Sequence, residues 1–396
     1  MKSEWSNKKI KDVVDIRRGA SPRPIHNFLA NNGMPWVKIA DATADPSRYL
    51  WKTNEYIIYE GIKKSVVVEP ETLIVSNSAT PGLPKIMKIN ACVHDGWLVF
   101  SNYRGITRDF LYYKFIDIRR KLVNQANGSV FQNLKTDIVK DFDIVIPSIQ
   151  TQNKIVDILS RLDDKIELNN AINENLLEQA SALFDNALKQ SESISFVELS
   201  SLADVKGGKR LPKGVNLITK PNSHPYIRVR NLNNMIFASL SSDYEYVDDE
   251  TQKSIARYIT SAGDVLVSIV GTIGLTAIVD DTLNNANLSE NCVKLTNLKG
   301  ITPEYLLLFL RSKIGVESIN KGIVGAVQLK LPIKNIQSIP VPLLMSVEMQ
   351  ALSDILSIMF NRISSNIIET QRLSELRDVL LPKLMSGEID VSNLDL

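Results

Sequence analysis

Three short motifs contain residues that could carry out chemistry, and each lacks something that the chemistry requires. The first is Asp163-Asp164-Lys165, which resembles the D-x-K motif of nucleases. A long helix is expected across these residues, and residues two positions apart on a helix point about 200° away from each other. Asp163 and Lys165 therefore cannot serve one metal ion.

The second motif, Cys92-Val93-His94-Asp95, offers side chains that bind metals. Its apparent counterpart later in the chain reads Cys292-Val293-Lys294, and the histidines of the whole sequence are His26, His94 and His224. Structural zinc is held by four ligands, most often Cys and His. This composition argues against such a site, and we expect no metal.

The third motif, Gly271-Thr272-Ile273-Gly274, could place main-chain amides around a phosphate. No lysine or serine that would open a helix follows it, so a turn after a buried strand is the better interpretation. The sequence also lacks a P-loop and the Asn/Asp-Pro-Pro-aromatic run of amino-methyltransferases. We therefore predict no catalytic residues and no cofactor.

Basic residues mixed with Ser, Thr and Asn point instead to nucleic acid. Long cations position a protein on phosphates, while Asn, Gln and Arg can read base edges. Arg228, Arg230 and Asn231 are expected at alternating or adjacent positions of a strand, with Lys38 and Asp41 as their counterparts. Two matched loops carry the remaining cations, which are Arg17, Arg18 and Arg23, beside Ser21, in one loop and Lys206, Lys209, Arg210 and Lys213 in the other. Ordinary solvated strand ends are the alternative interpretation.

The charge distribution agrees with contact to a polyanion. The net charge of the chain is +2. Residues 1–146 carry a net charge of +7 and residues 191–342 one of +2, whereas residues 147–190 carry −3 and residues 343–396 carry −4. Such a division fits globular domains that touch DNA while the helical segments stay clear of it.

Two long helices must position these loops. No Gly or Pro occurs from Ser148 to Lys206, so nothing interrupts a helix there. Core residues recur in alternating steps of four and three, the heptad of a coiled coil. The first series is Ile155, Leu159, Leu162, Ile166, Asn169, Asn173, Leu176, Ala180, Leu183 and Ala187. It returns 197 residues later as Leu352, Leu356, Met359, Ile363, Asn366, Thr370, Leu373, Arg377, Leu380 and Leu384.

The centre of each series is polar, with Asn169 and Asn173 in the first and Asn366 and Thr370 in the second. These residues meet if the helices pack antiparallel, although a parallel pair in register would also match them. A twofold relation between repeats favours the antiparallel pair. Buried Asn costs stability but fixes register. An ordinary amphipathic core helix is the alternative.

The matched helices belong to an internal duplication of the whole chain. Asp15–Gly19 returns as Asp204–Gly208, and Leu73–Ser76 returns as Val265–Ser268. Pro35–Ile39 likewise returns as Pro225–Val229. In the first half, short β-branched runs that indicate strands lie at Val13–Ile16, Trp36–Ile39, Thr72–Val75, Ala91–Val93 and Phe142–Ile146. The segments between matched strands differ, so one scaffold carries two different surfaces.

We expect a mixed α/β (α+β) fold with two β-rich domains in tandem, separated by two long helices that form an antiparallel coiled coil. The domains are predicted at residues 1–146 and 191–342, and the helices in 147–190 and 343–396. The two cysteines suggest a reducing compartment. The N-terminal residues lack the apolar region of a signal peptide, and no apolar stretch reaches transmembrane length. These features predict a cytoplasmic protein with no membrane partner.

The first long helix, with QNKIVDILSRLDDKIELNNAINENLLEQASALF, resembles the conserved region of specificity subunits of type I restriction–modification systems. The segment LRDVLLPKLMSGEID at Leu376–Asp390 is similar to the usual ending of that family. The approaches to the helices, Gln132 to Pro147 and Gln328 to Pro342, also fit the family, as does the Gly271–Gly274 motif. The second helix departs from the motif, because SIMFNRISSNIIETQRL stands where the first helix has SRLDDKIELNNAINENL.

The resemblance implies a non-catalytic subunit with two target-recognition domains, each reading half of a split site in double-stranded DNA. It further implies docking to two modification (methyltransferase) subunits and, through them, to restriction subunits. Adenine methylation and ATP-driven cleavage would belong to those partners. Two alternatives remain: a coiled-coil scaffold without a DNA role, and a free-standing restriction or modification enzyme.

The candidate DNA-binding residues combine the basic loops with polar residues beside the matched strands. In the first half they are Arg17, Arg18, Arg23, Lys38, Ser76, Thr80, Gln132 and Lys135. In the second half they are Lys206, Lys209, Arg210, Lys213, Arg228, Arg230, Asn231, Ser268, Thr272, Gln328 and Lys330.

Overall fold

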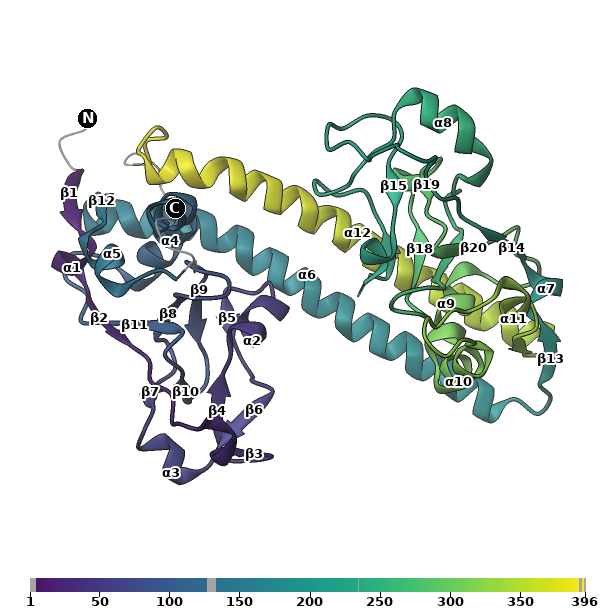
Figure 1. Cartoon of the computed structure of the whole chain (residues 1–396), viewed down its shortest axis with the longest axis horizontal. Coiled ribbons are helices and arrows are strands. Elements are labelled where there is room, and N and C mark those ends of the chain that lie inside the picture. The colour runs from purple at the N-terminus through teal and green to yellow at the C-terminus, as the bar shows by residue number, and fades with distance from the viewer. Residues whose placement is uncertain (1–4, 127–132, 234, 392–393, 395–396) are drawn as a thin grey trace. The chain divides into compact units, whose positions relative to one another are not determined.

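The computed structural model describes residues 5–126, 133–233, 235–391 and 394 (Figure 1). The chain forms two compact units. Unit 1 comprises residues 1–170 and 368–396, and unit 2 comprises residues 171–367. These units cut across the four segments expected from the sequence because each takes part of both long helices. The four-part division itself remains a prediction.

The long helices are α6 (Ile149–Gln190) and α12 (Ser346–Met385) (Figure 1). They run antiparallel within unit 1, where Asn169 of α6 donates hydrogen bonds to Glu369 at 2.9 Å and to Thr370 at 3.4 Å. Asp163, six residues before Asn169 on α6, accepts a hydrogen bond from Arg377, which lies seven residues after Thr370 on α12. Moving backward along one helix therefore corresponds to moving forward along the other. The predicted antiparallel direction is thus confirmed in this unit.

Unit 2 repeats the antiparallel pairing with other side chains. Asn366 donates to Asn173 at 2.8 Å, and both side chains are buried. Ser191, directly after the end of α6, donates to Glu348 at the start of α12 at 2.7 Å. The polar side chains expected at the centre of the two series therefore find hydrogen-bond partners inside the pair.

The predicted series of core residues is wrong at one position. Leu183 is exposed, and Phe184 is buried in its place. From Ala180 to Phe184 the step is four residues, and a straight α-helix of 3.6 residues per turn drifts by about 20° per heptad from a strict 3.5-residue repeat. The drift moves the core-facing position by one residue in this part of α6.

Unit 1 contains two five-stranded sheets and one two-stranded sheet among its described residues. Their orders are β2-β11-β8-β9-β5, β3-β6-β4-β10-β7 and β1-β12. The strands are β1 (Ser6–Lys9), β2 (Asp15–Arg18), β3 (Leu29–Ala30), β4 (Met34–Val37), β5 (Tyr49–Leu50), β6 (Glu55–Ile57), β7 (Val66–Val68), β8 (Leu73–Ser76), β9 (Pro84–Met87), β10 (Ala91–Val93), β11 (Trp97–Ser101) and β12 (Asp143–Ile146). The helices are α1 (Ile10–Val13), η1 (Ile25–Asn27), α2 (Ile39–Ala44), α3 (Tyr59–Ile62), α4 (Arg108–Ala126) and α5 (Thr136–Asp141).

Unit 2 repeats the first of these sheets in the order β14-β20-β17-β18-β16, and adds the pairs β13-β21 and β15-β19. Its strands are β13 (Ser195–Glu198), β14 (Asp204–Gly207), β15 (Tyr226–Ile227), β16 (Phe237–Ala238), β17 (Val265–Ser268), β18 (Thr276–Val279), β19 (Asn287–Leu288), β20 (Cys292–Thr296) and β21 (Pro340–Leu343). Its helices are α7 (Leu199–Leu202), η2 (Val229–Leu232), α8 (Asp249–Ile255), η3 (Ala256–Tyr258), η4 (Asp281–Leu283), α9 (Pro303–Arg311), α10 (Lys313–Gly322) and α11 (Ile333–Gln337). The tandem duplication predicted from sequence is confirmed.

Five predicted strand positions are helical instead. Val13 ends the short helix α1, Ile39 and Asp41 lie in α2, and Arg230 and Asn231 lie in the 3-10 helix η2. The main-chain N–H groups of Lys38 and Arg228 are each held by a side chain three residues later, which turns the chain into these short helices. Local capping thus overrides the β propensity of the branched residues.

The Asp163-Asp164-Lys165 motif has a packing role within unit 1. Asp163 is buried and accepts hydrogen bonds from the Tyr113 hydroxyl at 2.6 Å and from Arg377 at 2.8 Å. Burial raises the pKa of Tyr113, so its hydroxyl stays protonated and donates. Asp164 pairs with Arg48 on the β-rich portion, and Lys165 lies 3.3 Å from Glu369. The three side chains point to different partners, as the helical spacing predicted.

Within the part of the chain that the structure describes, none of the helices has the length and apolar composition that crossing a bilayer requires.

Candidate nucleic-acid interface

In unit 1, the loop after β2 is fastened to the turn between β10 and β11 by Asp95. Arg18 donates to the Asp95 main-chain oxygen at 2.6 Å, and the Ser21 hydroxyl donates to the carboxylate at 2.6 Å. Arg23 lies 3.3 Å from the other carboxylate oxygen. The Ser21 hydrogen bond, helped by the two guanidinium groups, lowers the pKa of Asp95, which therefore stays ionised. The Arg23 side chain is 80% exposed and remains open to a ligand.

Unit 2 has the same arrangement with different residues. Arg210 lies 2.7 Å from Glu290 in the turn between β19 and β20, and its side chain is also 80% exposed. The main chain shows that the turns are equivalent, since Gly208 donates to Cys292 at 3.0 Å as Gly19 donates to Trp97 at 2.9 Å. A carboxylate therefore orients the basic loop in both units.

This register corrects the alignment of the two cysteine motifs. Ser76 pairs with Trp97 across β8 and β11, and Ser268 pairs with Cys292 across β17 and β20. Cys292 therefore corresponds to Trp97, not to Cys92. By the same register, His94 corresponds to Ser289 and Asp95 to Glu290.

A second matched cation follows the strand beside this turn. In unit 1, Lys38 forms an ion pair with Glu55, and its main-chain N–H donates to Asp41 at 2.9 Å. In unit 2, the corresponding residue, Arg228, pairs with Glu245, which also holds Arg230 at 2.9 Å. Asn231 accepts the Arg228 N–H at 2.9 Å, so its amide oxygen serves the fold. The cations are held in fixed positions by carboxylates.

These residues line a groove in each unit. The groove of unit 1 has a volume of about 910 Å³, and Arg23 and Lys38 line it together with Trp36 and His94. The groove of unit 2 is smaller, about 430 Å³, and its lining includes Tyr226 and three arginines, Arg210, Arg228 and Arg230. Equivalent elements therefore build two grooves of different chemistry.

The serines of the matched strands are turn residues. Ser76 and Ser268 are fully buried. Each hydroxyl donates to a main-chain oxygen four residues later, at Thr80 or Thr272, and accepts from the main-chain N–H seven residues later. This engagement leaves the two serines no exposed surface for DNA. Thr80 is half-buried and Thr272 exposed, at the tips of the turns that the serines close.

The other candidate residues are exposed near these turns. Lys135 follows Leu134, whose N–H donates to Asn77 in the Ser76–Gly82 turn at 2.7 Å. Gln328 and Lys330 lie in an exposed loop that bridges to Val270. Arg17 and Lys206 are exposed on β2 and β14, and Lys209 and Lys213 are exposed in the loop after β14. Gln132 lies outside the described residues.

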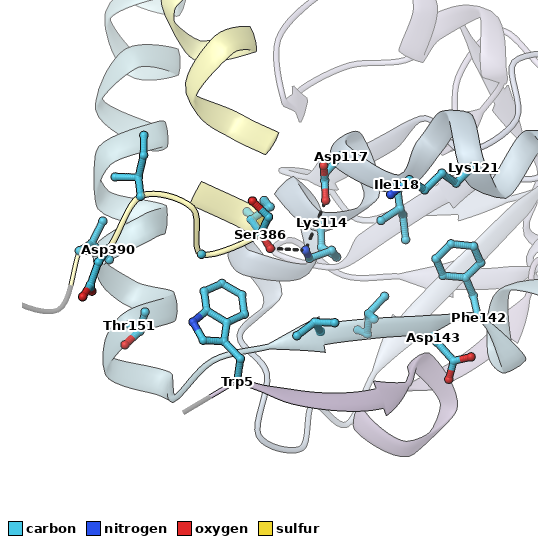
Figure 2. Close-up of a pocket in the computed structure, with 16 residues that line it drawn as sticks. Trp5, Lys114, Asp117, Ile118, Lys121, Phe142, Asp143, Thr151, Ser386 and Asp390 are labelled. Carbon is cyan, nitrogen blue, oxygen red and sulfur yellow. Dashed lines mark hydrogen bonds and ion pairs between the residues drawn. The ribbon is translucent and has the colours of Figure 1, made fainter. Parts of the chain in front are cut away.

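A second cavity in unit 1, of about 690 Å³, has a different character (Figure 2). Trp5 and Phe142 line it, and Figure 2 shows the Lys114 ammonium group directed toward Asp117. That group lies 2.9 Å from the Met385 main-chain oxygen and 3.3 Å from Asp117, and burial lowers the pKa of Lys114. The buried lysine ties the end of α12 to α4, which is a structural role.

Five residues of this region were not predicted as parts of a DNA interface. His94 and Glu290 line the grooves, and Asp95, Glu55 and Glu245 hold the cations that line them. Asp95 and Glu290 occupy equivalent turns of the two units. Their recurrence beside the same turns was hidden by the false match of Cys92 with Cys292. Counting from the matched Ser76 and Ser268 along the strand pairs would have revealed it.

Comparisons with known proteins agree with this duplicated architecture. The family model for the type I restriction modification DNA specificity domain matches residues 2–178 and 192–377. The type I restriction enzyme MjaIX specificity subunit of Methanocaldococcus jannaschii is 22% identical over 422 aligned positions, which cover 99% of this chain and 95% of the relative. The HindI specificity subunit of Haemophilus influenzae is 23% identical over 425 positions, covering 86% of this chain and 84% of the relative.

A crystal structure of a type I restriction–modification S subunit from M. genitalium shares the fold. Its TM-score is 0.57 at 16% identity, and the match covers 96% of each chain. The family model spans both halves of the duplication and most of both long helices. The chain therefore belongs to the family of type I restriction–modification DNA specificity subunits.

Proposed function

We propose that each unit reads one half of a bipartite site in double-stranded DNA. One observation carries this proposal: equivalent turns and carboxylates hold exposed cations in both units, while the grooves beside them differ in lining. The unit 1 groove contains Trp36 and His94, and the unit 2 groove contains Tyr226 and Ser289. Cations on phosphates position a protein, and variable groove residues read bases.

The candidate contacts are narrowed by their exposure. We retain the exposed or half-buried cations together with Thr80, Thr272 and Gln328, and also Gln132, which lies outside the described residues. We leave out Ser76 and Ser268 because they are buried, and Asn231 because its amide oxygen caps a turn. The retained groups are Arg17, Arg18, Arg23, Lys38 and Lys135 in unit 1 and Lys206, Lys209, Arg210, Lys213, Arg228, Arg230 and Lys330 in unit 2.

We further propose that the chain is non-catalytic and that methylation and cleavage are carried out by modification and restriction subunits. In support, Asp163 and Asp164, which resemble a nuclease motif, are engaged in packing within unit 1. Because DNA and such partners are cytoplasmic, we infer the same compartment for this chain.

An apolar stripe on α12 in unit 2 is the docking surface that we propose for a modification subunit. Val347, Ala351, Ile355 and Ile358 lie on one side of the helix and are exposed, with Ile358 at 72%. The residues 197 positions earlier, on α6, are Gln150, Lys154, Ile158 and Arg161. The stripe therefore belongs to α12 alone, so the two helices would dock their partners differently.

Replacing Ile355 and Ile358 together by Glu should abolish co-purification with the modification subunit, because two charges would enter an apolar interface. Since both side chains are exposed, the melting temperature of the free chain should change little. The matched control, Gln350→Glu with Asn361→Glu, adds the same charges on the other exposed flank of α12 and should keep the complex intact. Loss of the complex in both variants would contradict the assignment.

The function is tested by methylome sequencing of a host that expresses the chain with its modification subunits. We expect one bipartite methylated motif that disappears when the chain is omitted. The purified chain alone, supplied with ATP, Mg²⁺ and S-adenosylmethionine, should neither methylate nor cleave DNA. A motif that persists without the chain, or turnover that survives repurification, would contradict the proposal.

A further inference from the structure

His94 presents a single hydrogen-bond donor to the groove of unit 1. The main-chain N–H of Gly96 donates to His94 Nδ1 at 2.8 Å. Nδ1 is therefore an acceptor without a proton, and the proton of the neutral ring resides on Nε2. Within the described residues, Nε2 has no hydrogen-bond partner, and the ring lines the groove. Burial and the nearby Lys38 lower the pKa of His94, which favours the neutral ring.

The surroundings of the ring hold this orientation. The ring centroid lies 6.0 Å from that of Trp36 and 6.3 Å from that of Trp97. A Cβ added at Gly96 would lie 2.2 Å from His94 Cε1 and 2.6 Å from Nδ1. Only glycine at position 96 leaves the ring where it is, so the direction of the donor is built into the turn. A donor fixed before binding loses little entropy when it forms its bond.

The polar groups around the donor narrow what it can recognise. Arg23 and Lys38 also line the groove and carry donors only. Their carboxylate partners, Asp95 and Glu55, pair with these cations and do not line the groove. In the major groove, guanine presents two adjacent acceptors, N7 and O6, whereas cytosine presents an amino donor. The donors of His94, Arg23 and Lys38 therefore fit guanine and oppose cytosine. Ser21, Ser78 and His26 also line the groove, and their side chains can either donate or accept.

We propose that His94 reads one guanine of the half-site bound by unit 1, donating from Nε2 to N7 in the major groove. The assignment rests on the proposed DNA-reading function. The corresponding residue of unit 2, Ser289, is 4% exposed, and its hydroxyl faces Cys292 at 3.8 Å. Unit 2 lacks this donor, and the inference is confined to the first half-site.

The test uses the complex with its modification subunits and duplexes that carry the methylated motif. In each duplex one guanine of the motif is replaced by 7-deazaguanine, which has lost the N7 acceptor. When the replaced base is one particular guanine of the unit 1 half-site, the wild-type complex should bind the deaza duplex about ten-fold more weakly than the natural duplex. His94→Ala should show a similar loss on the natural duplex and no further loss on the deaza duplex. Gly96→Ala, which displaces the ring, should behave like His94→Ala.

The matched control is His224→Ala, which removes a histidine that pairs with Asp249 in unit 2. It should keep the ten-fold sensitivity to the deaza base. The assignment would be overturned if, at every guanine, 7-deazaguanine weakened binding by His94→Ala and by the wild type equally. It would also be overturned if Gly96→Ala kept the wild-type sensitivity to 7-deazaguanine. A wild-type complex that does not prefer its motif to a scrambled duplex would instead refute the DNA-reading function.

Discussion

Replacing Asp163 by Ala should strongly destabilise unit 1. The Asp163 side chain is buried, and its removal leaves the buried Tyr113 hydroxyl without its acceptor and Arg377 without its partner on α6. Removing one partner of a buried pair costs about 3–5 kcal/mol. Arg377 keeps Asp378 and its side chain is 27% exposed, so we expect about 3 kcal/mol, the lower end.

For a unit of about 200 residues, each kcal/mol lowers the melting temperature by about 2–4 °C, so the expected shift is about 6–12 °C. Differential scanning calorimetry of the free chain would measure it. Asp163→Asn keeps an acceptor for Tyr113 and should cost less. The control is Asp185→Ala, which removes an exposed aspartate from the same helix and should cost within about 0.5 kcal/mol.

The result that refutes the reasoning is an Asp163→Ala chain as stable as Asp185→Ala. If such a stable variant also failed to support methylation by the partner subunits, Asp163 would have a functional role that its buried contacts do not explain.

Two further predictions concern DNA. Neutralising Lys206, Lys209, Arg210 and Lys213 together should weaken non-specific binding and flatten the slope of log K against log salt by up to about 3.6, since each phosphate contact contributes about 0.9. As a control, neutralising the helix residues Arg161, Lys189, Arg362 and Arg372 should leave the slope unchanged. If the slope of the loop variant were also unchanged, the loop would not contact DNA. Four residues inserted into both helices, after residues 170 and 367, add about 6 Å, or roughly 2 base pairs of spacer, with both half-sites unchanged. A methylated motif with its original spacer would show that the helices do not set this distance.

The helices and the duplicated frame could be predicted because their signals are local and repeated. Asn173 and Asn366 stood at the centre of each series, and the structure joins them by a hydrogen bond. The error at Leu183 arose because the heptad was extended without the drift of a straight α-helix. Helix periodicity is thus reliable over a few turns and less so at the end of a long helix.

The grooves could not be predicted because their residues come together through strand register. Asp95 and Glu290 occupy equivalent turns of the two units. In the sequence, however, the match of Cys92 with Cys292 suggested a different alignment. The sequence also did not reveal which polar residues are exposed. Ser76 and Ser268 were predicted to contact DNA because they stand at strand ends, but they are buried in their turns. The role proposed for His94 depends on the hydrogen bond from the Gly96 N–H to Nδ1, which places the ring proton on Nε2. The sequence does not show this contact.

The central claim, that one scaffold carries two independent readers, is tested most directly by exchanging one of them. Residues 1–146 would be replaced by the equivalent domain of a family member with a different motif, and the methylome of a host expressing the hybrid with its modification subunits would be sequenced. We predict a motif in which one half is new and the other half is unchanged. A hybrid that alters both halves, or neither, would contradict the account.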